Sequence, residues 1–372
     1  MDQEIFHGRL VSAQGLTTAR DVAGLILFPS PNLYYLSGFE EEPAERHLLF
    51  IVTPTGHAMV APAMYEEQII EETYLDQVYA WDDGDDPMEI VEVAFDDVGL
   101  SGTDGTVLID DTMFARFTLD LREALPAASF RLVSELLGEL RITKDDSEID
   151  ALREAARLSD EVCAEIRALG SDAVGMTERE VVALMRSRFD ELGGHGFSFD
   201  PIVGSGPNGA KPHYRHGDRT IRAGEPVVLD FGTVVDGYPG DQTRTVVFEG
   251  EPPAEFAQIH EIVRAAFDAA IETVEPGIEA QEVDRAARAV IEEAGYGEQF
   301  LHRTGHGLGL EVHEEPYIVE GNDRLLEPGM VHSVEPGIYL DGHFGARVED
   351  IVVVTEDGCE QLNQSPRTWQ PL

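Results

Sequence analysis

A repeated pattern in the second part of the chain constrains the fold more than any other feature of the sequence. One unit, two stretches of helical periodicity followed by two β segments, occurs twice in succession. In the first unit one helix is predicted to begin near Ser147, and the next opens with a capping box from Thr177 to Glu180. The units comprise helices near 147–169 and 177–192 with β segments at 226–232 and 241–248, then helices near 254–274 and 279–294 with β segments near 331–340 and 346–354.

Each pair of β segments carries two carboxylates that lie among apolar or glycine neighbours instead of other charges. They are Asp230 and Asp241 in the first unit and Glu335 and Glu349 in the second. A buried ionised carboxylate is costly unless it is paired or bound to a metal. Any one of these residues alone is more often a hydrogen-bonded structural acid. The matched placement of four indicates a shared centre, because two units that face each other would bring all four side chains together.

His306, in the glycine-rich run 302–309, adds an imidazole to this set. Four carboxylates and one neutral histidine carry a summed charge that balances two divalent cations. Ligation mostly by oxygen with a single nitrogen suits Mn²⁺, Co²⁺ or Fe²⁺, and it does not correspond to a thiolate type of zinc site. The two cysteines, Cys163 and Cys359, are far apart in the sequence and support neither a disulfide framework nor a thiolate site.

The first part of the chain predicts a different, smaller domain. Short apolar runs at 22–28, 48–52 and 107–110 alternate with helical patterns, which is typical of an α/β domain. The apolar pattern breaks at 141–146. We therefore expect one domain over residues 1–140 and a second over 145–372.

The charge balance excludes some functions and favours one environment. The chain has 72 acidic and 26 basic residues and a formal net charge of −46, so a nucleic-acid-binding surface is excluded. A surface rich in carboxylates holds water and cations, and we interpret it as halophilic adaptation to a salt-rich cytoplasm. An ordinary acidic protein is the alternative. The chain lacks a signal-peptide pattern and any run of roughly 18 apolar residues, so we expect a cytoplasmic location without membrane contact.

The residues named above also lie in blocks that resemble the creatinase, prolidase and aminopeptidase P family, the M24 metallopeptidases. The segment His302 to Glu314 is similar to the family signature, with His302, His306, Gly309, His313 and Glu314 in register. Similar blocks occur, in the family's order, at 32–39, 229–232, 240–245, 335–339 and 347–350. The resemblance implies an α/β (α+β) pita-bread catalytic domain with a pseudo-twofold repeat, preceded by a creatinase-like N-terminal domain.

The resemblance also implies a role for particular residues. Glu335 would act both as a ligand and as the proton shuttle between water and the leaving nitrogen. His213 alone could equally be a surface-loop histidine, and Arg347 could equally be a structural partner of Asp350 or Glu349. The implied metal ligands are Asp230, Asp241, His306, Glu335 and Glu349, and the implied catalytic and substrate-side residues are His213, His302, His313, Glu335 and Arg347.

The implied activity is hydrolysis of the peptide bond between an N-terminal residue and proline. Two divalent ions, Mn²⁺ or Co²⁺ with Fe²⁺ or Zn²⁺ as alternatives, can activate water for attack on an amide at neutral pH. A metal-dependent hydrolase or lyase of a small compound such as ectoine, and a non-catalytic peptide-binding homologue, are the alternatives; the intact ligand set disfavours the latter. Whether dipeptides or longer peptides are preferred stays open. The family resemblance suggests a homodimer.

Overall fold

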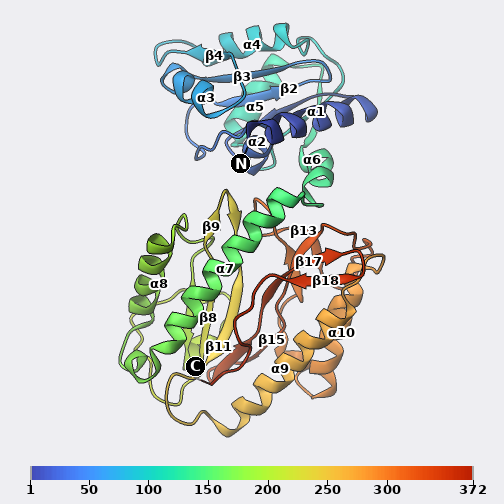
Figure 1. The fold of residues 1–372 in the computed structure, drawn as a ribbon. Coiled ribbons are helices and arrows are strands. Elements are labelled where there is room, and N and C mark those ends of the chain that lie inside the picture. The colour runs from blue at the N-terminus through green and yellow to red at the C-terminus, as the bar shows by residue number, and fades with distance from the viewer. Residues whose placement is uncertain (1, 371–372) are drawn as a thin grey trace. The chain divides into compact units, whose positions relative to one another are not determined.

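The computed structural model describes residues 2–370, which form two compact units (Figure 1). The first unit extends to Arg141 and the second begins at Ile142. No helix among the described residues is long and apolar enough to cross a membrane. Both cysteines are free, with Cys163 buried and Cys359 half-buried.

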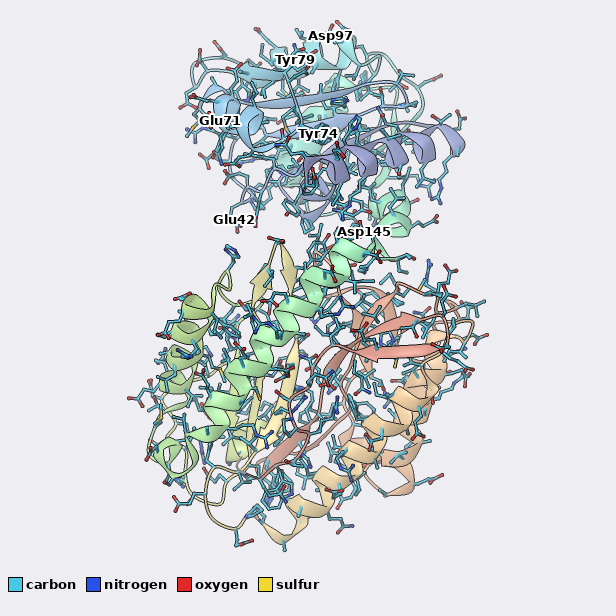
Figure 2. The ribbon with its side chains drawn as sticks, in the orientation of Figure 1. Glu42, Glu71, Tyr74, Tyr79, Asp97 and Asp145 are labelled. Atoms are coloured by element: carbon cyan, nitrogen blue, oxygen red, sulfur yellow. The ribbon has the colours of Figure 1, made fainter. Side chains whose placement is uncertain are left out.

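The first unit is a mixed six-stranded sheet with the strand order β4-β3-β2-β1-β5-β6. The central strand β1 pairs antiparallel with β2 and parallel with β5, and these strands are nearly continuous apolar runs because both faces are covered. Tyr79 donates a hydrogen bond of 2.8 Å to Asp97 at the end of α4 (Figure 2). The elements are α1 Gln3–Ala19, β1 Val22–Leu27, α2 Pro31–Ser37, β2 Leu49–Val52, β3 His57–Pro62, η1 Ala63–Tyr65, α3 Glu66–Glu72, β4 Val78–Trp81, α4 Pro87–Asp97, β5 Thr106–Ile109, α5 Ala115–Ala124, β6 Ser129–Leu132 and α6 Ser134–Arg141.

The second unit contains both copies of the predicted repeat, and each copy has its own hydrophobic core. In the first copy α7 and α8 pack on the sheet β11-β8-β7, and in the second α9 and α10 pack on strands of the sheet β13-β12-β14-β17-β18 (Figure 1). The elements are α7 Asp146–Ala168, η2 Gly170–Ala173, α8 Glu178–Leu192, β7 Ile202–Ser205, η3 Gly206–Ala210, β8 Val227–Phe231, β9 Val234–Val235, β10 Tyr238–Pro239, β11 Gln242–Val246, α9 Ala254–Thr273, α10 Ala280–Glu293, η4 Gly297–Gln299, β12 Gly305–Gly307, β13 Glu314–Ile318, β14 Val331–Val334, β15 Gly337–Leu340, β16 Phe344–Arg347, β17 Asp350–Thr355 and β18 Gly358–Gln361.

In the first copy a two-residue turn joins β9 to β10 in a hairpin. Asp236 and Gly237 adopt φ angles of 49° and 82°. Two successive positive φ angles are the requirement of the tight hairpin turns that match strand twist, and glycine meets it without a steric cost.

The two β segments predicted for the second copy were each drawn as one strand, and this was wrong. The segment near 331–340 is β14 and β15 with Glu335 and Pro336 between them, and the segment near 346–354 is β16 and β17 with Val348 and Glu349 between them. The reason is a change of partner, since β14 pairs with β17 in the large sheet while β15 pairs with β16 in a hairpin. Both interruptions fall at a predicted metal ligand.

Candidate metal centre

The two copies of the repeat meet at the predicted ligands. Asp230 lies within β8, opposite Thr243 on β11, and Asp241 directly precedes β11. Glu349, from the second copy, donates its backbone N–H to the carbonyl oxygen of Thr243 over 3.1 Å and accepts a hydrogen bond from the Thr243 hydroxyl. The register of β8 and β11 and this bridge therefore bring carboxylates from both copies together.

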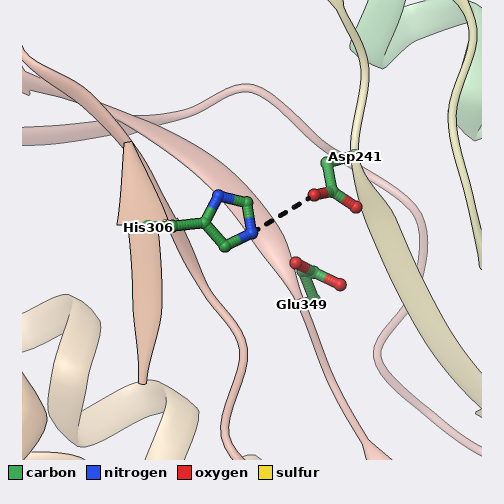
Figure 3. Close-up of side chains that lie close together, drawn as sticks. All are labelled: Asp241, His306 and Glu349. Atoms are coloured by element: carbon green, nitrogen blue, oxygen red, sulfur yellow. Dashed lines mark ion pairs between the residues drawn. The ribbon is translucent and has the colours of Figure 1, made fainter. Parts of the chain in front are cut away.

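The side chains of Asp241, His306 and Glu349 form a compact, buried group. One potential ligand atom from each lies within 4.8 Å of the others, and Figure 3 shows the imidazole of His306 facing the two carboxylates. Nε2 of His306 lies 3.6 Å from Asp241 Oδ2 and 3.3 Å from Glu335 Oε1. All five predicted ligands line one pocket of about 680 Å³, a size typical of small-molecule sites.

The orientation of His306 leaves the nitrogen that faces the carboxylates unprotonated. Its Nδ1 lies 3.2 Å from the carbonyl oxygen of Gly307 and must donate there, which makes Nε2 the atom with a free lone pair. Burial is the main cause that holds the pKa of His306 well below its usual value, and the nearby charge of Arg303 adds to it. A neutral imidazole with a free Nε2 is the form that binds a metal.

The carboxylates cannot all ionise in the bare protein. Burial and the negative charges of Asp230 and Glu335 hold the pKa of Asp241 well above its ordinary value, and burial and the other carboxylates do the same for Glu349. Burial raises the pKa of Glu335 to about 7, although the positive charge of Arg347 opposes the rise. The group therefore requires added positive charge to become fully ionised at neutral pH.

Two oxygen atoms provide an independent test of whether a metal fits. Oδ1 of Asp230 and Oδ1 of Asp241 are buried, and neither has a hydrogen-bond donor among residues 2–370. A buried acceptor without a hydrogen-bond partner lowers the stability of the fold by about 1–3 kcal/mol, and by more when the group is charged. A carboxylate oxygen that lacks a hydrogen-bond donor can bind a cation instead. The mixed set of oxygens with one nitrogen fits divalent ions.

Arg347 contacts the centre directly. It donates hydrogen bonds to Asp230 Oδ2, to the hydroxyl of Thr243 (3.0 Å) and to that of Tyr339 (2.7 Å), and its Nε lies 4.0 Å from Glu349. The guanidinium thus holds one oxygen of Asp230 and leaves the other for a different partner.

The alternative that Asp350 is the ion-pair partner of Arg347 is wrong. Asp350 is buried and pairs with Arg244 over 2.7 Å and with Arg367. These contacts anchor the start of β17, beside Glu349.

Besides His306, three histidines border the pocket in different environments. His302 is the most enclosed: its Nδ1 donates to the carbonyl oxygen of Arg303 (2.7 Å), its Nε2 accepts from the Tyr339 hydroxyl (2.8 Å), and burial lowers its pKa to about 4. His313 is exposed, and its ring centroid lies 4.1 Å from that of His306. His213 lines the pocket from the loop after η3.

A buried carboxylate that the sequence analysis did not identify holds the loop of His213. Glu178, fully buried at the start of α8, accepts five hydrogen bonds of 2.8–3.1 Å from this region. The donors are the backbone and hydroxyl of Ser205, the side chains of Asn208 and Tyr214, and the backbone of Gly217. In the sequence Glu178 stands directly after an N-cap and reads as an ordinary first-turn acid, so its burial had no local signal.

Thr243 and Tyr339 were also missed, although a signal was available. Both lie inside the blocks 240–245 and 335–339 that carry predicted metal ligands. Tyr339 joins Arg347 to His302, and Thr243 joins Arg347 to Glu349. Polar residues two to four positions from a predicted ligand are therefore themselves candidates for the site.

Comparison with known families identifies the fold and the class of protein. A sequence model described as "Metallopeptidase family M24" matches residues 150–356. The chain belongs to metallopeptidase family M24. A second model, "Creatinase/Prolidase N-terminal domain", matches residues 9–143. The predicted creatinase-type α/β domain followed by a pita-bread domain is thereby confirmed, and so is membership of a metal-dependent peptidase family.

Individual M24 relatives resemble the chain over its full length. It is 42% identical to the "Probable dipeptidase PepE" of Mycobacterium bovis, over 98% of this chain and 96% of that one. The structure is similar to that of a recombinant prolidase from Thermococcus sibiricus, with a TM-score of 0.93 and 38% identity over 100% of both chains. It also resembles an Xaa-Pro dipeptidase from Bacillus anthracis, with a TM-score of 0.88 and 30% identity over 99% of this chain and 100% of that one.

Proposed function

We propose that this protein is a metal-dependent Xaa-Pro dipeptidase, a prolidase, which hydrolyses the bond between an N-terminal residue and proline. The observation that carries the proposal is the buried group of Asp241, His306 and Glu349 within a pocket of about 680 Å³. The dipeptidase and prolidase descriptions of the relatives support the choice of substrate. Proline's amide has no N–H and a fixed φ, so a rigid pocket can select it.

In this proposal two divalent cations are held by Asp230, Asp241, His306, Glu335 and Glu349. Mn²⁺ and Co²⁺ are the expected ions, with Fe²⁺ and Zn²⁺ as alternatives. Bound there, the cations would supply positive charge for the scissile carbonyl oxygen and lower the pKa of the attacking water. Oδ1 of Asp230 and Oδ1 of Asp241, which are buried and have no hydrogen-bond donor among residues 2–370, would be available to such ions.

Glu335 is proposed as the group that moves the proton. All these carboxylates border the pocket, but the side chain of Glu335 is 15% exposed, whereas those of Asp241 and Glu349 are 5% and 3% exposed. One of its oxygens accepts from the Ser333 hydroxyl over 3.3 Å, which fixes the carboxylate. Glu335 can therefore take a proton from water and deliver it to the proline nitrogen, which must be protonated to leave as an amine.

The remaining side chains are assigned to the substrate. His313, exposed beside His306, can donate to the carbonyl oxygen as negative charge develops on it. His302 and Arg347 are joined through the Tyr339 hydroxyl and border the side of the leaving proline, while His213 positions the substrate from the opposite loop.

The test is a comparison of initial rates on Ala-Pro, Ala-Pro-Ala, Ala-Ala-Ala, creatine and ectoine, with added Mn²⁺ and molar salt. We expect Ala-Pro to be cut and the non-peptide compounds to be left intact. Preference for the tripeptide would indicate an aminopeptidase P, and turnover of creatine or ectoine alone would overturn the peptidase assignment. Glu335→Gln should lose several orders of magnitude in rate, whereas Glu272→Gln, on an exposed position of α9, should lose little.

Chelation tests the metal requirement separately. Turnover should disappear with the metal and return with Mn²⁺ or Co²⁺. Full activity in a sample verified as metal-free would contradict the proposed centre.

Three further expectations stay proposals. Domain limits of 1–140 and 145–372 can be checked by limited proteolysis, and the homodimer by sedimentation velocity. Adaptation to a salt-rich environment is tested by the stability measurement in the Discussion.

A further inference from the structure

The chain contains two lysines, and one of them is fully buried in an ion pair. The side chain of Lys144 is 0% exposed, and its Nζ lies 2.6 Å from Oε1 of Glu314, whose side chain is 10% exposed. The same ammonium donates to the carbonyl oxygen of Ile142 over 3.5 Å. Two apolar residues of similar volume often fill such a site without loss of stability. Stability alone therefore does not account for an ion pair at this place.

The backbone of Lys144 is fixed to the large sheet. Its N–H donates to the carbonyl oxygen of Gly329 over 2.9 Å, and the preceding residue, Thr143, pairs antiparallel with Met330 directly before β14. Gly329 has a φ of 88°, and a Cβ atom there would lie 2.9 Å from Cγ2 of Thr143. The ammonium of Lys144 therefore extends from a closely packed and well-fixed segment.

Glu314 closes the hairpin that carries His313. As the first residue of β13 it pairs with Gly307, the last residue of β12, so residues 308–313 form the loop between the two strands. His313 is exposed at the end of this loop, and its side chain has no hydrogen bond among residues 2–370. Its ring centroid lies 4.1 Å from that of His306. The position of the His313 imidazole therefore depends on the backbone of the loop.

The carboxylate of Glu314 faces back into this loop. Its Oε2 accepts from the backbone N–H of Glu311 over 3.4 Å, and a Cβ atom at Gly309 would overlap the carboxylate. Gly309 in turn donates its backbone N–H to the carbonyl oxygen of Glu311 over 3.1 Å. The ammonium of Lys144 binds the same carboxylate at Oε1. The loop is thus built around a carboxylate that Lys144 anchors.

We propose that the Lys144–Glu314 ion pair is a positioning device, which holds the loop 308–313 and so places His313 against the reacting carbonyl oxygen. The inference rests on the proposed function, in which His313 donates to that oxygen. Without the ammonium, the carboxylate of Glu314 has to become neutral or turn toward solvent, because a buried charge without a partner is costly. Either change releases the loop from its anchor, and a donor displaced by about 1 Å can slow a reaction about 100-fold.

Steady-state kinetics on Ala-Pro test the effect on catalysis. Glu314→Gln keeps the size of the side chain but removes its charge, and Lys144→Met removes the ammonium. Each should lower kcat about 10- to 100-fold and change KM by less than about 3-fold, because a donor to the developing oxyanion acts only in the transition state. In a His313→Ala background the further loss should be less than about 3-fold. Glu320→Gln is the matched control: Glu320 pairs with Arg285 over the same 2.6 Å, but at the surface beyond β13, and the variant should keep wild-type kinetics.

Hydrogen exchange in the metal-free protein gives a readout that needs no turnover. The backbone amides of residues 308–314 should exchange at least about 10-fold faster in Lys144→Met and in Glu314→Gln than in wild type, while those of β17 should exchange at the wild-type rate. Unchanged exchange in the loop, or faster exchange throughout the chain, would overturn the positioning role.

The kinetic cycle and the exchange measurement separate this inference from the proposed function. Equal losses of kcat with and without His313 would show that Lys144 does not act through that residue, and the proposed function would stand. Absence of hydrolysis by wild-type protein, together with faster exchange confined to the loop in the variants, would overturn the proposed function and support the hold of the ion pair on the loop.

Discussion

The four buried carboxylates should make the stability of the metal-free protein depend on pH, by an amount that can be calculated. Burial raises the pKa of Glu335 from 4.5 to about 7. The pKa of Glu335 is higher in the folded protein than in the unfolded protein. The stability that this group contributes is therefore fully present below about pH 4.5 and is lost as pH rises through 7. The shift corresponds to roughly 3 kcal/mol at higher pH, with Asp241 and Glu349 adding losses in the same direction.

The difference between two metal-free proteins isolates this contribution. The buried histidines, His260 and His332 among them with pKa values lowered to about 4, act in the opposite direction below pH 6.5. The contribution of these histidines to stability is the same in wild-type protein and in Glu335→Gln, so it cancels in the comparison. In the variant the side chain at position 335 cannot ionise. Relative to wild type, the variant should therefore gain roughly 3 kcal/mol between pH 4.5 and 8, or about 6–12 °C in the melting midpoint for a domain of this size.

The assay is thermal unfolding of chelator-treated protein at several pH values, repeated with Mn²⁺. Added metal should stabilise wild type by an amount that increases with pH, because metal and protons compete for the same oxygens. Glu272→Gln, at an exposed position on α9, should follow wild type throughout. A constant difference between Glu335→Gln and wild type across this pH range would refute the reasoning.

Three other predictions follow from the structure. Melting midpoints should rise strongly with KCl, because the Debye length falls from about 10 Å at 0.1 M to about 3 Å at 1 M; a midpoint independent of salt would contradict halophilic adaptation. Glu178→Gln should lower kcat/KM about 10-fold, and by less than about 3-fold in a His213→Ala background if Glu178 acts by holding that loop; equal losses in both backgrounds would argue for a general structural role. Arg244→Met, which removes a buried partner of Asp350, should cost about 3 kcal/mol in urea unfolding; a wild-type midpoint would show that Arg367 alone suffices.

Much of the architecture was readable from local patterns. The helices were predicted close to their observed limits, as with 254–274 against α9 Ala254–Thr273, because helical periodicity and caps depend on neighbours within a few turns. The strands of the second copy were less accurate. The break between β14 and β15 contains Pro336, which has no backbone N–H for a strand partner, so a local signal was present there and was not used.

The sequence by itself determined which residues are candidates for a metal centre, since four carboxylates and one histidine occur in a repeated setting. Only the tertiary structure decided which groups meet. Arg347 and Asp230 are 117 positions apart, and Thr243 and Glu349 are 106 apart. Their contacts depend on the register between the two copies, which is set by the packing of two separate cores and has no local signature.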